Sequence, residues 1–286
     1  MSSILNSQNA LNTIELGQHE KAPHGVWLSK VIARWTERLD RWVPTPMPPI
    51  LRTSGLAEDN HVADQPSLEV SDWIAIDDHG MAMVAGALSA ALVVVLGRMV
   101  GAQEVHIGWR TIVDLGDQDR EAQSTEQNLE ACIKRLDAAP LYVLVDPQGS
   151  FMELASCVGQ ELERLRDDAE LLASELGKDA RVQTLAARLQ NTWPLVVEFA
   201  ANPEDFPDCC AQHHDQPLTL QFSEAPRLVR WVYDPQQWNL QALERISVYA
   251  QEMLHQASSF ERGMQPVSRL DILPAQEREQ LLVGFN

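Results

Sequence analysis

An uncharged run of 18 residues, GMAMVAGALSAALVVVLG (80–97), limits the possible folds of this chain more than any other stretch. It just reaches the length at which an apolar segment can span a bilayer as a helix. Its Ala and Gly content is high, Asp77 and Asp78 stand immediately before it, and no basic flank supports insertion. A buried helix inside an α/β domain has the same appearance. We therefore expect a core helix over about 79–100, with a membrane helix as the alternative.

Patterns typical of strands and helices alternate along the rest of the chain. In EVHIGW (104–109) the residues Val105, Ile107 and Trp109 lie on one side, as in a half-buried strand, and His106 is expected on the other. Further strands are expected in SLEVSDW (67–73) and at 141–146, 194–199, 218–222 and 228–234, and helices from about Val26, near 121–137, over 150–190, after the capping residue Asn239 and around 275–283. This order predicts an α/β layered sandwich.

Three tryptophans fall within the first expected helix and its end. Trp27, Trp35 and Trp42 recur near helical spacing together with Val31 and Leu39. Large aromatic side chains in such a stripe are usually part of a core. We therefore expect all three tryptophans to be buried.

The N-terminus and the cysteines indicate a protein of the cytoplasm. Residues 1–25 are polar, lack the basic flank and apolar run of a signal peptide, and are expected to form a flexible leader. The four cysteines, at 132, 157, 209 and 210, show no regular spacing, so a disulfide framework is not expected. We interpret Cys132 and Cys157 as small core residues.

The charge balance excludes two classes of partner. A formal net charge of −19 disfavours nucleic acid and anionic membranes, both of which need a basic surface, and leaves a protein with a basic patch as a candidate. The stretch 189–226 has no Lys or Arg and carries six acidic residues: Glu198, Glu204, Asp205, Asp208, Asp215 and Glu224. We interpret it as solvated surface.

The stretch CCAQHHDQ (209–216) places two cysteines and two histidines within six positions, which raises the question of a metal site. Adjacent cysteines do not easily direct both thiolates to one ion, and zinc sites prefer cysteines separated by two to four residues. The adjacent pair His213 and His214 has the same defect. We expect no metal site and no cofactor, and interpret this stretch as an acidic surface loop.

The C-terminal stretch PVSRLDILPAQEREQLLVGFN (266–286) closely resembles the segment that joins a condensation domain to an adenylation domain in nonribosomal peptide synthetases. In that family it reads Pro-Val-Ser-x-Leu-x-x-Leu, then Glu-Arg-x-x-Leu-Leu, then an Asn near the adenylation boundary. Residues 27–49 resemble the bridging helix and proline-rich crossover between the two lobes of the family. Segments 87–109, 140–158, 193–205, 216–224 and 229–246 follow in the family's order.

The resemblance implies a single chloramphenicol-acetyltransferase-like lobe over 26–264, an incomplete condensation-domain fold, followed by a linker over 265–286. The catalytic motif of the family, His-His-x-x-x-Asp-Gly, belongs to the N-terminal lobe, which we expect to be missing here. Neither HHDQPLT (213–219) nor DDHG (77–80) fits that motif. We therefore expect no catalytic residue in this chain and no condensation activity.

The function that the resemblance implies is an interaction platform at the N-terminus of a synthetase. The lobe is expected to pack on a downstream adenylation domain, to recruit a tailoring enzyme such as an oxygenase to a carrier-bound amino acid, or to self-associate through the face that a second lobe would cover. Contacts with the downstream domain are expected from four residues of the tail, Leu270, Leu273, Leu281 and Leu282.

Two alternatives stay open. In the first, the chain is one half of a split condensation enzyme, completed in trans by a lobe that carries HHxxxDG. In the second, it is a purely structural cap for the adenylation domain.

Trp109 and Arg110 are expected to follow a strand in the substrate-proximal loop of the family. There they would narrow an acceptor channel, in line with lost catalysis.

Overall fold

A computed structural model describes residues 24–51, 67–69, 81–111, 138–189, 193–200, 218–223, 228–234, 237–258 and 260–284. Several predictions lie outside these residues: the leader as far as residue 23, the helix near 121–137, Cys132, the DDHG stretch and the cysteine- and histidine-rich stretch 209–216.

Within these described ranges, six strands form one mixed sheet in the order β1-β6-β5-β4-β2-β3. Their bounds are β1 Ser67–Glu69, β2 Glu104–Thr111, β3 Ala139–Leu144, β4 Leu195–Ala200, β5 Leu218–Ser223 and β6 Leu228–Val232. Strands β2, β4 and β5 run parallel to one another, and the remaining neighbours pair antiparallel. The predicted α/β class is confirmed, with a strand at every expected position.

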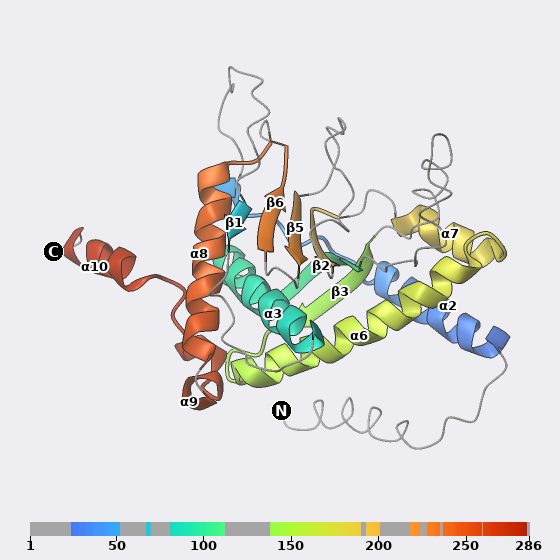
Figure 1. The fold of residues 1–286 in the computed structure, drawn as a ribbon, viewed down its shortest axis with the longest axis horizontal. Coiled ribbons are helices and arrows are strands. Elements are labelled where there is room, and N and C mark those ends of the chain that lie inside the picture. Colours follow the sequence, from blue (N-terminus) through green and yellow to red (C-terminus); the bar gives the residue numbers. More distant parts are fainter. Residues whose placement is uncertain are drawn as a thin grey trace.

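The helices are α2 His24–Asp40, α3 Met81–Val100, α6 Phe151–Glu175, α7 Ala180–Leu189, α8 Leu240–Ala257, α9 Phe260–Gly263 and α10 Ala275–Gly284. The described residues also form two short 3-10 turns, η1 Pro49–Leu51 and η3 Val267–Arg269. Helix α3 packs against both α6 and α8, while α2 packs against α6 and α7. Figure 1 shows α2 and α7 at one end of the molecule and α10 at the other.

Helix α3 is the core helix that its lack of charge predicted. Every residue from 84 to 97 is buried. A Cβ on Gly86 would lie 2.6 Å from the carbonyl oxygen of Ala155 and 2.7 Å from the Cα of Gly159, so the close crossing of α3 and α6 requires glycine there. Among the helices that the structure describes, none combines the length and the apolar character that a membrane span requires.

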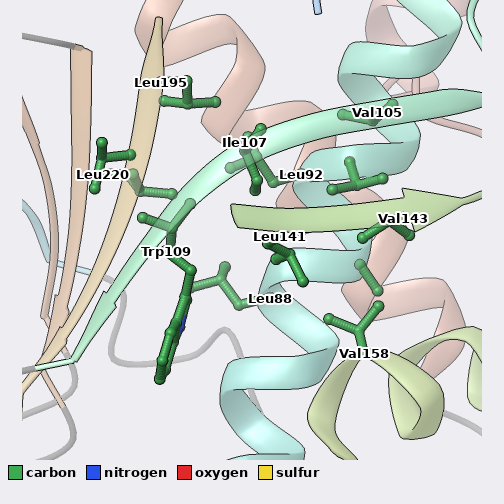
Figure 2. Close-up of a cluster of buried hydrophobic side chains, with 14 of the residues drawn as sticks. Leu88, Leu92, Val105, Ile107, Trp109, Leu141, Val143, Val158, Leu195 and Leu220 are labelled. Atoms are coloured by element: carbon green, nitrogen blue, oxygen red, sulfur yellow. The ribbon is translucent and has the colours of Figure 1, made fainter. Parts of the chain in front are cut away.

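The two sides of β2 differ as its alternation predicts. Val105, Ile107 and Trp109 point into the layer between the sheet and α3, where Figure 2 shows them with Leu88 and Leu92. His106 lies on the opposite side of the strand, where its ring contacts Trp42. We call that side, which α3 does not cover, the second face of the sheet.

Helix ends follow from local sequence. Ser150 and Glu153 form a capping box at the start of α6, and the side chain of Asn239 accepts from the amide of Ala242 at 3.2 Å, as predicted for α8. The region 150–190 divides into two helices because α6 ends at Glu175 and Asp179 accepts from the amide of Arg181 at 2.8 Å to begin α7.

Two core predictions are wrong. Trp35 is fully buried and Trp42 is partly buried, but Trp27 is 46% exposed because it lies near the beginning of α2, beyond the part of the helix that α6 covers. Cys157 is an exposed free thiol. Around this position the buried residues of α6 include Ala155, Val158 and Gly159, and position 157 falls on the solvent side of that repeat.

Candidate functional site

A row of polar side chains crosses the second face of the sheet. Arg110 of β2, Glu198 of β4, Gln221 of β5 and Arg230 of β6 stand opposite one another in register. These positions lie near the carboxyl ends of the parallel strands β2, β4 and β5. We call this row the polar ladder.

Hydrogen bonds join the four members of the polar ladder. Arg110 Nη1 donates to Glu198 Oε1, and Gln221 Nε2 donates to Glu198 Oε2 at 2.7 Å. Arg230 Nε donates to Gln221 Oε1 at 2.5 Å. Glu198 and Gln221 are almost completely buried, and a buried carboxylate is tolerated only when it is paired and hydrogen-bonded. Both carboxylate oxygens are engaged, so the ladder holds strands together.

The polar ladder corrects two sequence interpretations. Glu198 is 1% exposed, so it is not part of a solvated acidic surface, because β4 lies inside the sheet between β5 and β2. Trp109 and Arg110 do not follow a strand, because both are residues of β2 itself. The indole of Trp109 fills the layer between the sheet and α3, and Arg110 pairs with Glu198. Neither lies in a loop.

Four aromatic rings form a second cluster, on the second face beside β2 and β3. The ring centroids of Trp42 and Trp193 are 4.4 Å apart, those of Trp42 and His106 5.2 Å, and those of His106 and Tyr142 4.8 Å, all edge to face. Burial lowers the pKa of His106, and the neighbouring Glu104 opposes this change. Burial, with the nearby carboxylate of Glu104, raises the pKa of Tyr142.

The tail is bound to the body of the protein by a strap, residues 264–273. The amide of Val267 donates to Gly149 O at 2.8 Å, and that of Ser268 donates to Pro147 O at 3.0 Å. Arg98, at the end of α3, donates to the carbonyl oxygens of Val267 and Leu270, the latter at 2.6 Å. Burial lowers the pKa of Arg98, against the raising effect of Asp271. The strap is thus part of the folded unit.

The four predicted tail leucines fall into two groups. Leu270 is 3% exposed and belongs to the core of this chain, and Leu273 packs against that core. Leu281 and Leu282 are 44% and 63% exposed on α10, where Val283 is also exposed. The structure therefore separates two residues that fasten the tail from two whose predicted contact with a downstream domain stays a prediction.

Helix α10 is attached through its first turn. The hydroxyl of Tyr249 on α8 donates to Glu277 Oε1 at 2.9 Å, and Arg278 pairs with Asp271 at 2.8 Å. Burial raises the pKa of Tyr249, and its hydrogen bond to Glu277 adds to this effect. Figure 1 shows the rest of α10 extending away from α8. Its three exposed apolar residues lie at this far end.

Metal ligands are not gathered in the described ranges, which hold no cluster of three or more His, Cys, Asp or Glu side chains able to bind an ion. The stretch 209–216, which raised the metal question, lies outside those ranges.

No family model matches the sequence, and no curated protein matches it. Solved structures do match. A double mutant of the starter condensation domain of rhizomide synthetase RzmA, in complex with C8-CoA and Leu-SNAC, superposes with a TM-score of 0.54 at 16% identity, over 95% of this chain and 59% of that one. The X-domain from teicoplanin biosynthesis gives 0.53 at 14% identity, over 94% and 61%.

The chain has a condensation-domain-like fold. Holo-AB3403, a four-domain nonribosomal peptide synthetase bound to AMP and glycine, also matches, with a TM-score of 0.52 at 12% identity, over 87% of this chain and 20% of that one. The chain spans about three fifths of the length of the solved condensation domain and X-domain that it matches. The condensation-domain-like fold confirms the resemblance found in the sequence.

Proposed function

We propose that this condensation-domain-like chain is a non-catalytic interaction module of a nonribosomal peptide synthetase. The sequence contains no His-His-x-x-x-Asp-Gly motif, and its one adjacent histidine pair, His213 and His214, lacks the Asp-Gly that would follow. The clusters in the described residues are paired or packed: the polar ladder joins strands, and the four rings lie against one another. These features support a role in binding.

The observation that carries the proposal is the arrangement of the tail. The strap is hydrogen-bonded to the body of the protein and buries Val267 and Leu270, so the start of α10 has a fixed position. The far end of α10 then presents Leu281, Leu282 and Val283 to solvent. Contiguous exposed apolar side chains on a short helix are typical of a binding surface, because such a helix gains little stability alone.

The partner that we propose for this surface is an adenylation domain continuing the same polypeptide. The tail resembles the family segment that leads into such a domain, and a four-domain peptide synthetase is among the matching structures. In the proposed complex Leu281 and Leu282 insert into an apolar groove, while the strap keeps the two domains in a fixed relation.

A recruited tailoring enzyme, such as an oxygenase acting on a carrier-bound amino acid, is the second proposed partner. The match to the X-domain from teicoplanin biosynthesis shows that the fold of this chain is shared by a domain that carries another name than condensation domain. The net charge of −19 favours a partner with a basic surface, since opposite charges speed association. We place this protein in the cytoplasm, where synthetases assemble secondary metabolites.

One observation favours the alternative of a split enzyme completed in trans. Val43, Tyr142 and Leu144 are 67%, 46% and 54% exposed, and Tyr142 and Leu144 point to the second face of β3. A separate lobe carrying HHxxxDG would cover this patch. Self-association would cover it too, and a purely structural cap for the adenylation domain would not need it.

The test uses the synthetase polypeptide that contains this chain. The double substitution Leu281→Ser and Leu282→Ser should increase hydrogen exchange at the facing surface of the adenylation domain and leave the thermal unfolding of this module unchanged. Val26→Ser is the matched control, because Val26 is 47% exposed and belongs to α2, which lies at the opposite end of the molecule from α10 (Figure 1). If hydrogen exchange at that surface is the same in both variants, the proposed contact does not form.

Recruitment and catalysis are separated by two further measurements. Native mass spectrometry with the neighbouring tailoring enzymes should detect a complex, and this module without the rest of the synthetase should be sufficient to form it. Deletion of the module should reduce tailoring without reducing amino-acid activation. Peptide-bond formation by the purified chain, alone or with an added HHxxxDG lobe, would instead establish the enzymatic alternative.

A further inference from the structure

Among the residues that the structure describes, the first half of β2 has a strand neighbour on one side only. Strand β3 pairs with β2 from Glu104 to Trp109, but β4 pairs with it only from Gly108 onward. The amide of Val145 donates to Gln103 O at 2.8 Å. In an antiparallel pair the bonded positions alternate, so the amide of His106 points away from β3, toward the side that β4 leaves open.

The segment after α2 takes that open place. We call residues 42–47 the crossover. Thr45, which is buried, accepts a hydrogen bond from the amide of His106 at 2.7 Å. The amide of Val43 donates to His106 Nδ1 at 3.5 Å, and the ring of Trp42 packs edge to face on the imidazole. His106 of β2 thus contacts the crossover in three ways: through its main-chain amide, through its ring nitrogen Nδ1 and through the packing of its ring on Trp42.

The bond from Val43 needs a particular form of the imidazole. Nδ1 can accept a proton donor only while it carries no proton, which requires the neutral ring with its hydrogen on Nε2. When the ring is protonated, both nitrogens donate, and Nδ1–H would then face the amide N–H of Val43. Two donors cannot form a hydrogen bond, so this attachment is lost.

The charged and titratable groups around the imidazole come from three elements. Glu104 lies on the same strand and favours the protonated ring, whereas burial disfavours it and is the larger effect. The hydroxyl of Tyr142 comes from β3 and stays neutral at ordinary pH, because its pKa is raised. Arg41, from the end of α2, acts on Tyr142 and is held by Glu37 at 2.7 Å.

We propose that His106 is a pH-sensitive latch, which holds the crossover against the sheet while its imidazole is neutral and releases it when the imidazole is protonated. Release removes the Val43 bond and loosens the contact of Trp42 with His106 and Trp193. The crossover connects α2 to the rest of the fold, so the latch controls how firmly α2 is joined to the sheet at this point. This property is independent of the function proposed above.

The experiment follows the amide of Val43 by NMR hydrogen exchange in the intact chain, with rates corrected for the intrinsic effect of pH. The opened form regains the ordinary histidine pKa of about 6.5, so uptake of one proton increases opening by at most about fivefold between about pH 6.5 and 5.5 and approaches tenfold per pH unit only below that range. The protection of Val43 should therefore fall by up to about fivefold between about pH 6.5 and 5.5, while amides within α3 keep theirs.

Two substitutions of His106 test separately whether it must accept the hydrogen bond from Val43 and whether it must change its protonation state. In His106→Asn an amide oxygen can accept from Val43 without titrating, so protection should persist at low pH. In His106→Phe the ring remains but the acceptor is lost, so Val43 should be weakly protected at every pH. His255→Asn, at an exposed position on α8, is the control and should retain the full response.

Several results would overturn the latch. Constant protection of Val43 over this range in the unsubstituted protein would do so, and so would a fall of the same size that persists in His106→Asn. If His106→Phe does not fold, the imidazole resonances of the unsubstituted chain decide the matter, since the shift of His106 and the loss of Val43 protection must share one midpoint.

Discussion

The indole N–H of Trp35 on α2 donates to the carboxylate of Asp168 on α6, with Trp35 Nε1 and Asp168 Oδ2 3.0 Å apart. Arg34 Nε donates to the same oxygen at 3.0 Å, and the Arg34 guanidinium also pairs with the other carboxylate oxygen. Asp168 is 2% exposed, so neighbouring residues of one helix supply the partners that its burial requires. This carboxylate fixes the position of α2 on the fold.

We expect Asp168→Ala to lower the free energy of unfolding by about 3 kcal/mol, because it leaves the Trp35 N–H and the Arg34 guanidinium without their acceptor. Urea denaturation monitored by circular dichroism measures the change. Asp167→Ala is the control, since Asp167 is an exposed neighbour on the same helix and should change stability by less than about 0.5 kcal/mol. Equal effects would show that Asp168 has no special role.

Gly86→Ala should destabilise the protein by about 2 kcal/mol or more, because the added Cβ meets the main chain of α6 at Ala155 and Gly159 and forces α3 and α6 apart. Thermal unfolding followed by calorimetry measures this loss. Gly177→Ala provides the comparison, because a Cβ there has nothing within 4 Å. An unchanged unfolding temperature in Gly86→Ala would mean that the two helices are less closely packed than the structure shows.

All three tyrosines should ionise late in the folded protein. Burial is the main cause of the raised pKa of Tyr142, Tyr233 and Tyr249. A tyrosine whose folded pKa exceeds its unfolded value of about 10 contributes stability below that pH and loses it as the pH rises through the folded pKa. Absorbance at about 295 nm should therefore titrate above pH 10 before unfolding and near pH 10 in denaturant.

The substitution Tyr249→Phe tests the part that Glu277 plays in this alkaline response. It should remove one tyrosine from the titration and detach the first turn of α10, which hydrogen exchange at residues 276–280 will report. Tyr233→Phe should also remove one tyrosine but leave exchange in α10 unchanged. A titration with its midpoint below pH 10 in the folded protein would contradict the burial of these side chains.

Arg98→Lys should loosen the strap while preserving the positive charge. A guanidinium can donate to the carbonyl oxygens of Val267 and Leu270 together, whereas an ammonium group lacks that flat, two-pronged geometry. We expect faster hydrogen exchange at Val267 and Leu270 and a loss of about 1–2 kcal/mol in stability. Arg269→Lys, at an exposed position in the same strap, should show neither effect. If both variants behave alike, Arg98 does not hold the strap.

The sequence predicts those elements whose pattern is local. The uncharged run that became α3 contains its own signal, and so do the alternation in β2 and the cap at Asn239. Each depends on residues within about two helical turns, where periodicity and capping preferences operate. The resemblance of the tail extends this to the strap, because its pattern lies in one continuous stretch.

The polar ladder could not be predicted in the same way, because its partners are distant in sequence. Arg110 and Glu198 are 88 positions apart, and only the order of strands in the sheet brings them together. One signal was present: Glu198 stands inside the apolar strand PLVVEF, and a lone carboxylate in a buried strand requires a partner. This signal is weak in the sequence because Glu198 lies within the acidic stretch 189–226, which as a whole indicates solvated surface.

The wrong prediction for Trp27 has a related reason, whereas Cys157 lies on the solvent side of the α6 repeat. Periodicity shows which residues share a helix face, but it does not show how far along that face the neighbouring helix extends. Helix α6 meets α2 at Arg34, Trp35 and Arg38, so Trp27 lies past the contact. The same limit applies to His106. Alternation along β2 predicts that His106 lies on the second face, but it does not predict the crossover beside it. The crossover lies there because β4 pairs with β2 only from Gly108 onward.

The strap also bears on how such modules can be exchanged. Val267 and Leu270 fill the interior of this unit, and their carbonyl oxygens are bound by a residue that precedes them by more than 160 positions. A gene fusion joined just before residue 265 would discard these two anchors and expose the apolar site that they occupy. Recombination between related synthetases should therefore tolerate junctions after the strap far better than junctions before it.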